Sequence, residues 1–344
     1  MPERIQNFYG NAGVVETLEG MLGRDRIPQT ILLAGPEGIG KATLARRFAA
    51  ALLGETQKIE HDDLSRPDNA GLIAEREKLP ADKRSEDPLL FSSHPDFITF
   101  PPDGPLRQIS IQQMRVLKER AQYKPLRGRY RIFLIDRLDR ANEQAANSLL
   151  KILEEPPEHL LLFATAQNAY DLLPTIRSRS VMLQLCRLTD EEMAAFASAH
   201  GLKDGQKRLA LAGGRPGLAL SLDLENWEKR RTAMMKLLSV AAGKGQFGDW
   251  ARVSESLSAS RSEKLDGYLD VLYTLLEDLL LLQNGASGIR NQDVKSELSA
   301  LAKDVDFEWI RRAVAKVDEL VEFLRRNIQK GIALDALVTD LRGR

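Results

Sequence analysis

The chain has 344 residues, more than one hydrophobic core usually organises, so two or three domains are expected. Hydrophobic residues make up 43% and charged residues 28%, a balance that is typical of folded proteins and excludes an intrinsically disordered chain. Lys plus Arg and Asp plus Glu number 49 each, so no global positive field attracts the chain to nucleic acid. Any contact with nucleic acid must therefore come from a local patch or through bound partners.

The sequence shows no pattern of a membrane span or a secretion signal. The richest apolar run, 269–282, is interrupted by Asp270, Glu277 and Asp278 and falls short of the roughly 20 uncharged residues that a span needs. The N-terminal residues MPERIQNFYG lack the basic start and apolar stretch of a signal peptide. A single cysteine, Cys186, excludes an intramolecular disulfide, and we expect it to be a small buried strand residue. These features predict a cytoplasmic protein.

The first half of the chain has the pattern of a parallel α/β domain. A strand-like run at 31–34 leads through a glycine-rich turn into a helical pattern over 41–53. Helical stretches separate the later strand-like runs, which indicates a parallel sheet with crossover helices. These later strands are predicted at 96–100, 131–135, 160–165 and 181–185.

Two crossover helices have clear boundary signals. One begins at Ser110, which with Gln113 forms a plausible capping box. The other runs over about 143–155 and ends at Pro156 and Pro157, because proline cannot continue a helix. Both helices are expected to cover the sheet.

The rest of the chain divides by composition. The polar stretch 55–93, broken by three prolines, is predicted to be a partly mobile insertion and not a core element. After the last strand only helical patterns remain, and no internal repeat is present. We predict an α/β domain at 1–187, a small helical domain at 188–223 and a larger helical domain at 224–344.

The turn after the first strand carries a phosphate-binding loop. Its residues are Gly35, Pro36, Glu37, Gly38, Ile39, Gly40 and Lys41. Successive backbone N–H groups and the helix N-terminus would cradle phosphates, while Lys41 reaches the outer phosphates. The position that normally ligates magnesium through a hydroxyl is Ala42, and Thr43 points about 100° away around the helix. ATP or ADP binding with weakly held magnesium is predicted.

The second half of a nucleotide site would come from the strand 131–135. It ends in Asp136, which can hold magnesium through water. In hydrolytic relatives of such a site the next residue is a glutamate that activates the attacking water, and this chain has Arg137 there. Asp139 is the nearest alternative carboxylate, but a general base must first be within reach of its water. Slow or absent hydrolysis is expected.

A resemblance to a known family rests on three segments: 132–136, ANSLLKILEEPP at 146–157 and LPTIRSRS at 173–180. Together they resemble bacterial clamp-loader subunits of the AAA+ class. The delta-prime branch is resembled in particular by FYGN at 8–11, SHPDF at 93–97 and RNI at 326–328. The resemblance is dense over about 5–53 and 93–220 and diffuse beyond.

This resemblance implies a fold of the α/β plus all-α class, with an AAA+ P-loop sheet domain, a helical lid and a helical collar. The family's Ser-Arg-Cys motif falls on 178–180, with Ser180 in the cysteine position. Arg179 would then be an arginine finger, inserted into a neighbouring subunit's ATP site. Thr165 matches the family's first sensor, and Arg215 matches its second sensor at the start of a lid helix.

The resemblance also implies partners and a role in DNA replication. We expect a non-motor stator in a hetero-pentameric ring with gamma/tau motor and delta subunits, which loads a sliding clamp onto primed DNA. Such a chain would belong to the DNA polymerase III holoenzyme, with little or no ATPase and no polymerase activity of its own. The alternatives are an ATP-hydrolysing gamma/tau-type motor and a scaffold that never binds nucleotide; Ala42 and Arg137 oppose the motor.

Further expectations concern metals, DNA and assembly. Most relatives carry four zinc-binding cysteines within 55–93 and this chain has none there, so neither zinc nor any other metal site is predicted. Arg115 and Lys118 are candidates for a weak DNA contact, although exposed helix faces usually carry such charges. Two apolar stripes favour either core packing or a collar: Leu265, Leu269, Leu272, Leu276 and Leu279, then Val314, Val317, Leu320, Val321 and Leu324.

Overall fold

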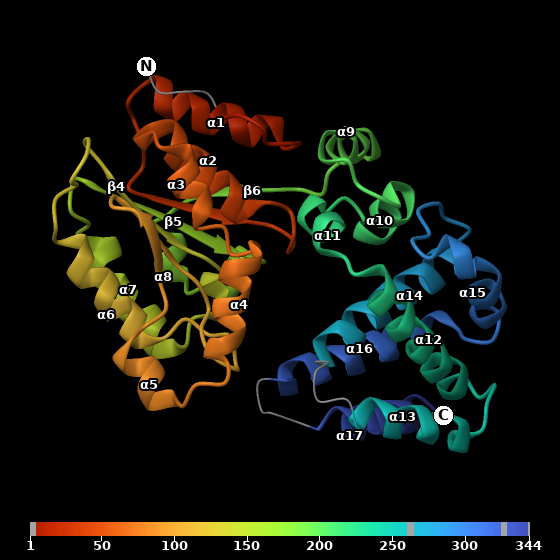
Figure 1. Ribbon diagram of the computed structural model, residues 1–344. Helices are drawn as coiled ribbons and strands as arrows, with labels where there is room; N and C mark the ends of the chain where they lie inside the picture. Colours follow the sequence, from red (N-terminus) through yellow and green to blue (C-terminus); the bar gives the residue numbers. More distant parts are fainter. Residues whose placement is uncertain (1–4, 260–264, 325–328, 343–344) are drawn as a thin grey trace. The chain divides into compact units, whose positions relative to one another are not determined.

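The computed structural model describes residues 5–259, 265–324 and 329–342, which form two compact units (Figure 1). The first unit comprises Met1–Gly205 and Gly214–Ser221, and the second comprises Gln206–Gly213 and Leu222–Arg344. The segment 188–223, expected to be a lid, is thus divided between the two units, because parts of it make most of their contacts with different units. The division into three domains stays a prediction. RNI at 326–328 lies outside the described residues.

A six-stranded sheet organises the described part of the first unit, in the order β2-β3-β4-β5-β1-β6. Its strands are β1 (Thr30–Ala34), β2 (Phe91–His94), β3 (Phe97–Phe100), β4 (Arg131–Ile135), β5 (Leu160–Ala166) and β6 (Val181–Gln184). All neighbours pair in parallel except β2 and β3. The five predicted strands are therefore present, and the antiparallel edge strand β2 is an addition that the polar sequence did not indicate.

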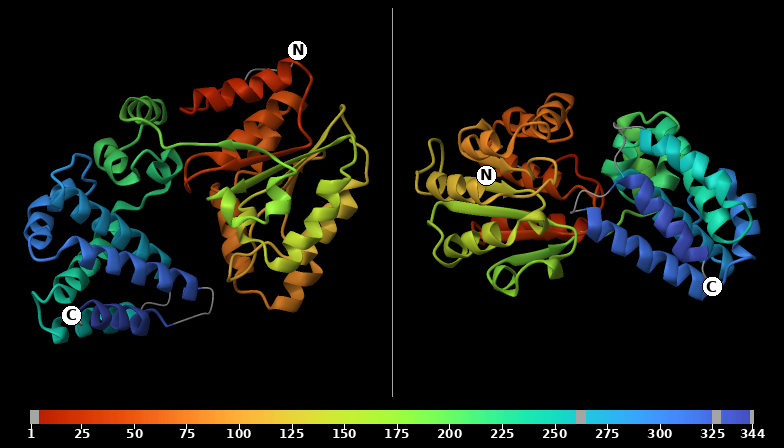
Figure 2. Two further views of the ribbon diagram at one scale, coloured as in Figure 1. Left: turned by 180° about the vertical axis from the view of Figure 1, so that it is seen from behind. Right: turned by 90° about the horizontal axis from the view of Figure 1, so that it is seen from below.

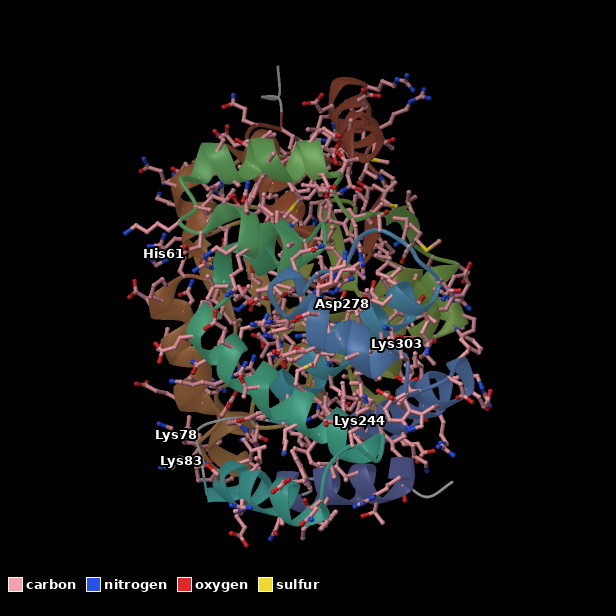
Figure 3. The ribbon with its side chains drawn as sticks, turned by 90° about the vertical axis from the view of Figure 1, so that its right-hand side faces the viewer. His61, Lys78, Lys83, Lys244, Asp278 and Lys303 are labelled. Atoms are coloured by element: carbon pink, nitrogen blue, oxygen red, sulfur yellow. The ribbon has the colours of Figure 1, made fainter. Side chains whose placement is uncertain are left out.

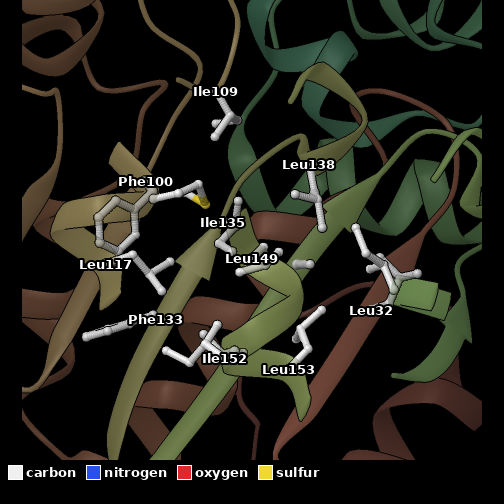
Figure 4. Close-up of a cluster of buried hydrophobic side chains, with 14 of the residues drawn as sticks. Leu32, Phe100, Ile109, Leu117, Phe133, Ile135, Leu138, Leu149, Ile152 and Leu153 are labelled. Atoms are coloured by element: carbon white, nitrogen blue, oxygen red, sulfur yellow. The ribbon is translucent and has the colours of Figure 1, made fainter. Parts of the chain in front are cut away.

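Helices cover both faces of this sheet (Figure 2). On one face α6 (Ile111–Ala121) and α7 (Glu143–Glu154) pack on buried strand residues such as Leu32 and Phe133 (Figure 4). On the other face α2 (Lys41–Leu53) places Phe48 against Phe163 of β5, with ring centroids 5.1 Å apart. Burial on both faces explains why the central strands are continuously apolar.

The predicted helix boundaries are confirmed at α6 and α7. The Ser110 hydroxyl accepts from the Gln113 N–H at 3.3 Å, and the Gln113 side-chain oxygen accepts from the Ser110 N–H at 2.9 Å. This reciprocal pair is the capping box that fixes the start of α6. α7 ends at Glu154, directly before the turn that Pro156 and Pro157 impose.

The stretch 55–93 contains more secondary structure than its sequence indicates. It contains α3 (Thr56–His61), α4 (Pro67–Arg76), α5 (Ala81–Glu86) and β2. Polar contacts hold the first part of this stretch: the buried Arg46 guanidinium lies 2.6 Å from Asp63 and 3.3 Å from Glu60. The fully buried Asp62 carboxylate accepts from the Ser93 N–H at 3.1 Å. Hydropathy periodicity misses such contacts, because no apolar repeat marks them.

The prediction for Cys186 was wrong, because its side chain is exposed. It lies two residues after Gln184, the last residue of β6, beyond the part of the strand that pairs with β1. Its backbone is held by Asn11, whose side-chain oxygen accepts from the Cys186 N–H at 2.7 Å and whose amide donates to the Cys186 carbonyl at 3.0 Å. The position thus needs the backbone of Cys186 and leaves its thiol in solvent.

The described part of the second unit is helical. Its helices include α12 (Leu224–Ala241), α13 (Phe247–Ala259), α14 (Leu265–Gln283), α15 (Lys295–Ala302), α16 (Phe307–Leu324) and α17 (Lys330–Arg342). The first predicted stripe, on α14, is buried at all five leucines, so it forms core. In the second stripe Val317 is buried and Val321 is 41% exposed, while the side chain of Leu324 lies outside the described residues.

A buried carboxylate ties α14 to the loop that follows it. Asp278, labelled in Figure 3, is fully buried and accepts hydrogen bonds from the Arg290 N–H at 2.8 Å and the Asn291 N–H at 2.9 Å. The Asn291 side-chain amide donates a third bond, at 2.8 Å. One side chain therefore satisfies three donors that would otherwise be buried without partners. Within the described ranges, no helix combines the length and apolar character that crossing a membrane requires.

Candidate nucleotide-binding site

The phosphate-binding loop lies between β1 and α2, as its sequence requires. Gly35, Gly38 and Gly40 have φ values of +147°, +78° and +100°, which only glycine adopts without strain. A Cβ at Gly35 would stand 2.5 Å from the carbonyl oxygen of Leu185. Ile39 is fully buried, so its side chain belongs to the core and only its backbone is available to a ligand.

The lysine of the loop is turned onto the loop itself. The Lys41 Nζ donates to the carbonyl oxygens of Gly35 at 2.6 Å and Pro36 at 2.8 Å. Burial lowers the pKa of the Lys41 ammonium, and the nearby Asp136 and Glu37 carboxylates partly offset that effect. A phosphate would have to exchange these carbonyl contacts for its own oxygens.

The hydroxyl that could have replaced the missing magnesium ligand is engaged elsewhere. Ala42 has no side-chain oxygen, and the hydroxyl of Thr43 accepts from the Arg46 Nη2 at 3.4 Å. This partner lies one helical turn further along α2. Of the described residues, no group of three or more His, Cys, Asp or Glu is placed to hold a metal ion.

The ends of β4 and β5 meet beside the loop. The buried Thr165 hydroxyl donates to the Asp136 carboxylate at 2.6 Å and accepts from the Arg137 N–H at 2.7 Å. A hydroxyl carries a single hydrogen, so Thr165 cannot also donate to a phosphate without releasing Asp136. The two residues predicted to face nucleotide are therefore partners of each other.

Arg137 crosses from the end of β4 to the loop and pairs with Glu37. Its guanidinium donates in bidentate fashion to the Glu37 carboxylate, at 2.9 and 3.1 Å. Gln167 adds a donor to the same carboxylate at 2.8 Å. We call the contacts among Glu37, Arg137 and Gln167 the loop clasp. Sequence analysis missed it, although the opposite charges of Glu37 and Arg137 on two adjacent site motifs were a usable signal.

Asp139 lies closer to the site than its sequence position suggests. Its carboxylate interacts electrostatically with Lys41 and Arg137, and burial raises the pKa of Asp139. One of its oxygens, Oδ1, is buried without a hydrogen-bond partner. A carboxyl group that is harder to ionise is a weaker electrostatic partner for a magnesium ion.

The segment around Arg215 touches the loop through backbone atoms. Arg215 precedes α11 (Pro216–Ser221), and its carbonyl accepts from the Ala219 N–H at 3.1 Å. The next glycine, Gly217, donates its N–H to the Gly38 carbonyl at 2.8 Å. A Cβ at Gly217 would lie 3.0 Å from that same oxygen. The start of α11 is thus fixed directly on the phosphate-binding loop.

Arg179 lies at the opposite end of the sheet from the loop. It precedes β6, which pairs with β1 from Ile31 to Ala34, whereas the loop follows the far end of β1. The five residues of β1 separate the two ends of the sheet, which is roughly 16 Å at the rise of a β-strand. The side chain is 36% exposed. The same chain cannot therefore bring Arg179 to its own phosphate-binding loop.

The remaining candidates are basic or histidine side chains. Arg115 is exposed on α6, and burial together with the nearby Lys151 lowers the pKa of Lys118. His94 is buried against Glu55 at 3.6 Å, and burial lowers its pKa. His61 contacts the Ser93 hydroxyl at 3.1 Å. These histidines thus take part in the polar contacts of 55–93, and the DNA-contact role of Arg115 and Lys118 stays a prediction.

Known protein families match segments of both units. A sequence model described as "DNA polymerase III, delta subunit" matches residues 10–189, and one described as "DNA polymerase III, delta subunit, C terminal" matches 225–342. The Escherichia coli (strain K12) protein "DNA polymerase III subunit delta'" is 28% identical over 253 residues, which cover 72% of this chain and 73% of that protein. Its Pseudomonas aeruginosa namesake is 31% identical, over 62% of this chain and 61% of that protein.

Two further similarities are weaker. "DNA polymerase III subunit tau" of Escherichia coli (strain K12) is 28% identical over 196 residues, which cover 56% of this chain and 27% of that protein. A solved gamma-subunit-related protein from Thermotoga maritima covers 95% of this chain and is itself covered to 99%, at 20% identity and a TM-score of 0.45. That score is too low to support a functional argument.

Proposed function

The chain belongs to the DNA polymerase III delta-subunit family, and we propose that it acts as the delta-prime subunit of a bacterial clamp loader. In this role it is a stator, in a hetero-pentameric ring with gamma/tau motor subunits and a delta subunit. It donates Arg179 to a neighbouring motor's ATP site, and the ring loads the sliding clamp onto primed DNA. Residues 1–187, 188–223 and 224–344 serve as ATPase-fold, lid and collar domains.

The position of Arg179 is the observation that carries this proposal. It is exposed at the sheet end opposite its own phosphate-binding loop, where it cannot reach that loop but is accessible to another molecule. A guanidinium in that place can stabilise charge on the phosphoryl group that a neighbour transfers. The chain's own site has Ala42 and Arg137 where a motor needs a hydroxyl and a glutamate, which supports a donor role.

For the chain's own loop we propose weak binding of ATP or ADP, with little help from magnesium and without turnover. Backbone N–H groups of Gly38 to Lys41 would hold the phosphates, with Lys41 as the charge partner. The loop clasp opposes this binding, because the Glu37 carboxylate lies at the phosphate cradle and repels an anion. Arg215 and Thr165, matched to sensor positions, would contact the nucleotide once their present contacts are exchanged.

We expect Glu37→Gln to tighten ADP binding about five-fold, since removal of one partly exposed charge contributes about 1 kcal/mol. The substitution removes the repelling anion and frees Arg137 to face the phosphates. Titration with a fluorescent ADP analogue, with magnesium and with a chelator, measures the effect. Glu16→Gln, an exposed acid on α1 (Ala12–Gly23), is the control and should leave the affinity unchanged. Equal affinities for Glu37→Gln and Glu16→Gln would refute a role for the clasp.

Reconstitution tests the proposed function as a whole. Steady-state ATP hydrolysis is measured for this chain alone, and for its motor and delta subunits with and without it, in the presence of clamp and primed DNA. The stator predicts a silent isolated chain and a complex that loads clamp only when the chain is present. Motor-like turnover by the isolated chain would instead support the gamma/tau alternative. No measurable nucleotide affinity in any form, with loading intact, would support the scaffold alternative.

A further inference from the structure

From the contacts of Arg179 we infer that Glu154 is a positioning residue, which holds the Arg179 guanidinium ready for the neighbouring site. The inference rests on the proposed function of Arg179. Glu154 is the last residue of α7, and its Oε1 accepts from the Arg179 Nη2 at 3.0 Å. The Arg179 Nη1 is held separately by the Thr175 carbonyl at 3.1 Å, with the Ser178 hydroxyl at 3.5 Å.

These contacts restrain the guanidinium without exhausting its donors. A guanidinium has five N–H groups in a rigid fork, and the three contacts occupy at most three of them. The other N–H groups suffice for a phosphate oxygen. An arginine side chain otherwise loses much rotamer freedom when a ligand fixes it, so two anchors on its own chain reduce that loss at the moment of reaction.

The anchor itself is fixed. Glu154 precedes the turn formed by Pro156 and Pro157, and the Gln29 side-chain amide donates to the carbonyls of both prolines, at 3.4 and 3.1 Å. Gln29 immediately precedes β1, so the end of α7 is attached to the start of the central strand. Glu154, Gln29 and Arg179 line one recess of about 390 Å³. The carboxylate therefore has a defined place from which to orient Arg179.

The local energetics of α7 do not explain an acid at this position. The C-terminal end of a helix carries partial negative charge, so a carboxylate there is unfavourable for the helix. Glu154 occupies the last helical position, and Glu155 follows it as the cap residue. The Arg179 guanidinium is the cation that Glu154 contacts in the structure. Removing Glu154 should consequently leave the stability of the fold unchanged or slightly raised, while it loosens Arg179.

The test uses the reconstituted loader with Glu154→Ala, Glu154→Gln and the matched control Glu155→Ala, which removes the neighbouring exposed acid. Because the pair is partly exposed, we expect Glu154→Ala to lower kcat at the motor site that receives Arg179 about two- to five-fold, with the KM for ATP at that site unchanged. Glu154→Gln keeps the acceptor oxygen and should restore most of kcat. Glu155→Ala should behave as wild type. Thermal unfolding of the isolated chain should show no loss of stability for any of the three.

Arg179→Ala distinguishes a failure of the proposed arginine finger from a failure of the positioning role of Glu154. If Arg179→Ala leaves ATP hydrolysis unchanged, the proposed finger is wrong and the inference about Glu154 loses its basis. If Arg179→Ala lowers kcat but Glu154→Ala matches Glu155→Ala, or raises kcat, the positioning role alone is overturned. The role also requires that Glu154→Ala has no further effect on kcat in an Arg179→Ala background.

Discussion

Arg179→Ala should abolish single-turnover ATP hydrolysis at one motor site of the reconstituted loader. Removal of a transition-state guanidinium lowers the rate at such a site by about 10³- to 10⁵-fold in other NTPases. Each copy of this chain carries one Arg179, so rapid-mixing measurements should lose one equivalent of released phosphate per complex. Steady-state rates fall by a smaller factor when the other sites still turn over.

Two variants distinguish the finger from a general charge effect. Arg179→Lys keeps the positive charge but not the planar fork, and should recover little of the lost equivalent. Arg177→Ala removes an arginine two residues earlier, whose guanidinium lies 4.8 Å from the ring centre of Tyr170, and should keep the full phosphate release. Full release by Arg179→Ala, or equal losses for both alanine variants, would rule out a specific role for Arg179.

Asp278→Asn should destabilise the helical second unit by about 3 kcal/mol. An asparagine has a single acceptor oxygen, which in the place of Asp278 Oδ2 keeps at most the two bonds from Asn291, while its own N–H groups point at the Arg290 N–H. Buried donors left without an acceptor cost about 1 to 3 kcal/mol each. The loop at Arg290 and Asn291 should then detach from α14 before the core helices separate.

Tryptophan fluorescence isolates this effect, because all three tryptophans, Trp227, Trp250 and Trp309, belong to the second unit. In urea the fluorescence transition of Asp278→Asn should shift to a lower midpoint with an unchanged slope. Asp266→Asn, an exposed acid in the first turn of α14, serves as the control and should stay within about 0.5 kcal/mol of wild type. A midpoint for Asp278→Asn equal to that of Asp266→Asn would show that the three bonds contribute nothing net.

The elements of the first unit could be predicted where apolar periodicity and local signals agree. The strand before the phosphate-binding loop and the capping box at Ser110 needed only neighbouring residues, and both were confirmed. The helices of 55–93 escaped prediction because no apolar repeat marks them; α3, for example, is held by ion pairs of Glu60 and of the following Asp63 with Arg46 on α2. The prediction for Cys186 was wrong for a related reason, since the exposure of its side chain depends on where the edge strand β6 stops pairing.

The candidate site likewise has features that the sequence predicts and contacts that it does not. Motif spacing located Lys41 and Asp136, because chain order alone brings the two motifs to one edge of a parallel sheet. It could not show that Arg137 reaches Glu37, which requires the left-handed backbone at Arg137, where φ is +59°. Nor could it show that Glu154 meets Arg179, 25 residues later. Contacts between side chains distant in the sequence depend on packing that no local pattern records.

The glycine contact between the phosphate-binding loop and α11 has a mechanical consequence. Gly217 and Gly38 meet backbone to backbone, with a 2.8 Å hydrogen bond and no side chain between them. Side chains accommodate small shifts by changing rotamer, but two backbone segments in direct contact lack this rotational freedom. A displacement of the loop would therefore displace α11 by a similar amount. In the proposed stator, the same stiffness would make the loop and α11 a fixed reference for the movement of a neighbouring subunit.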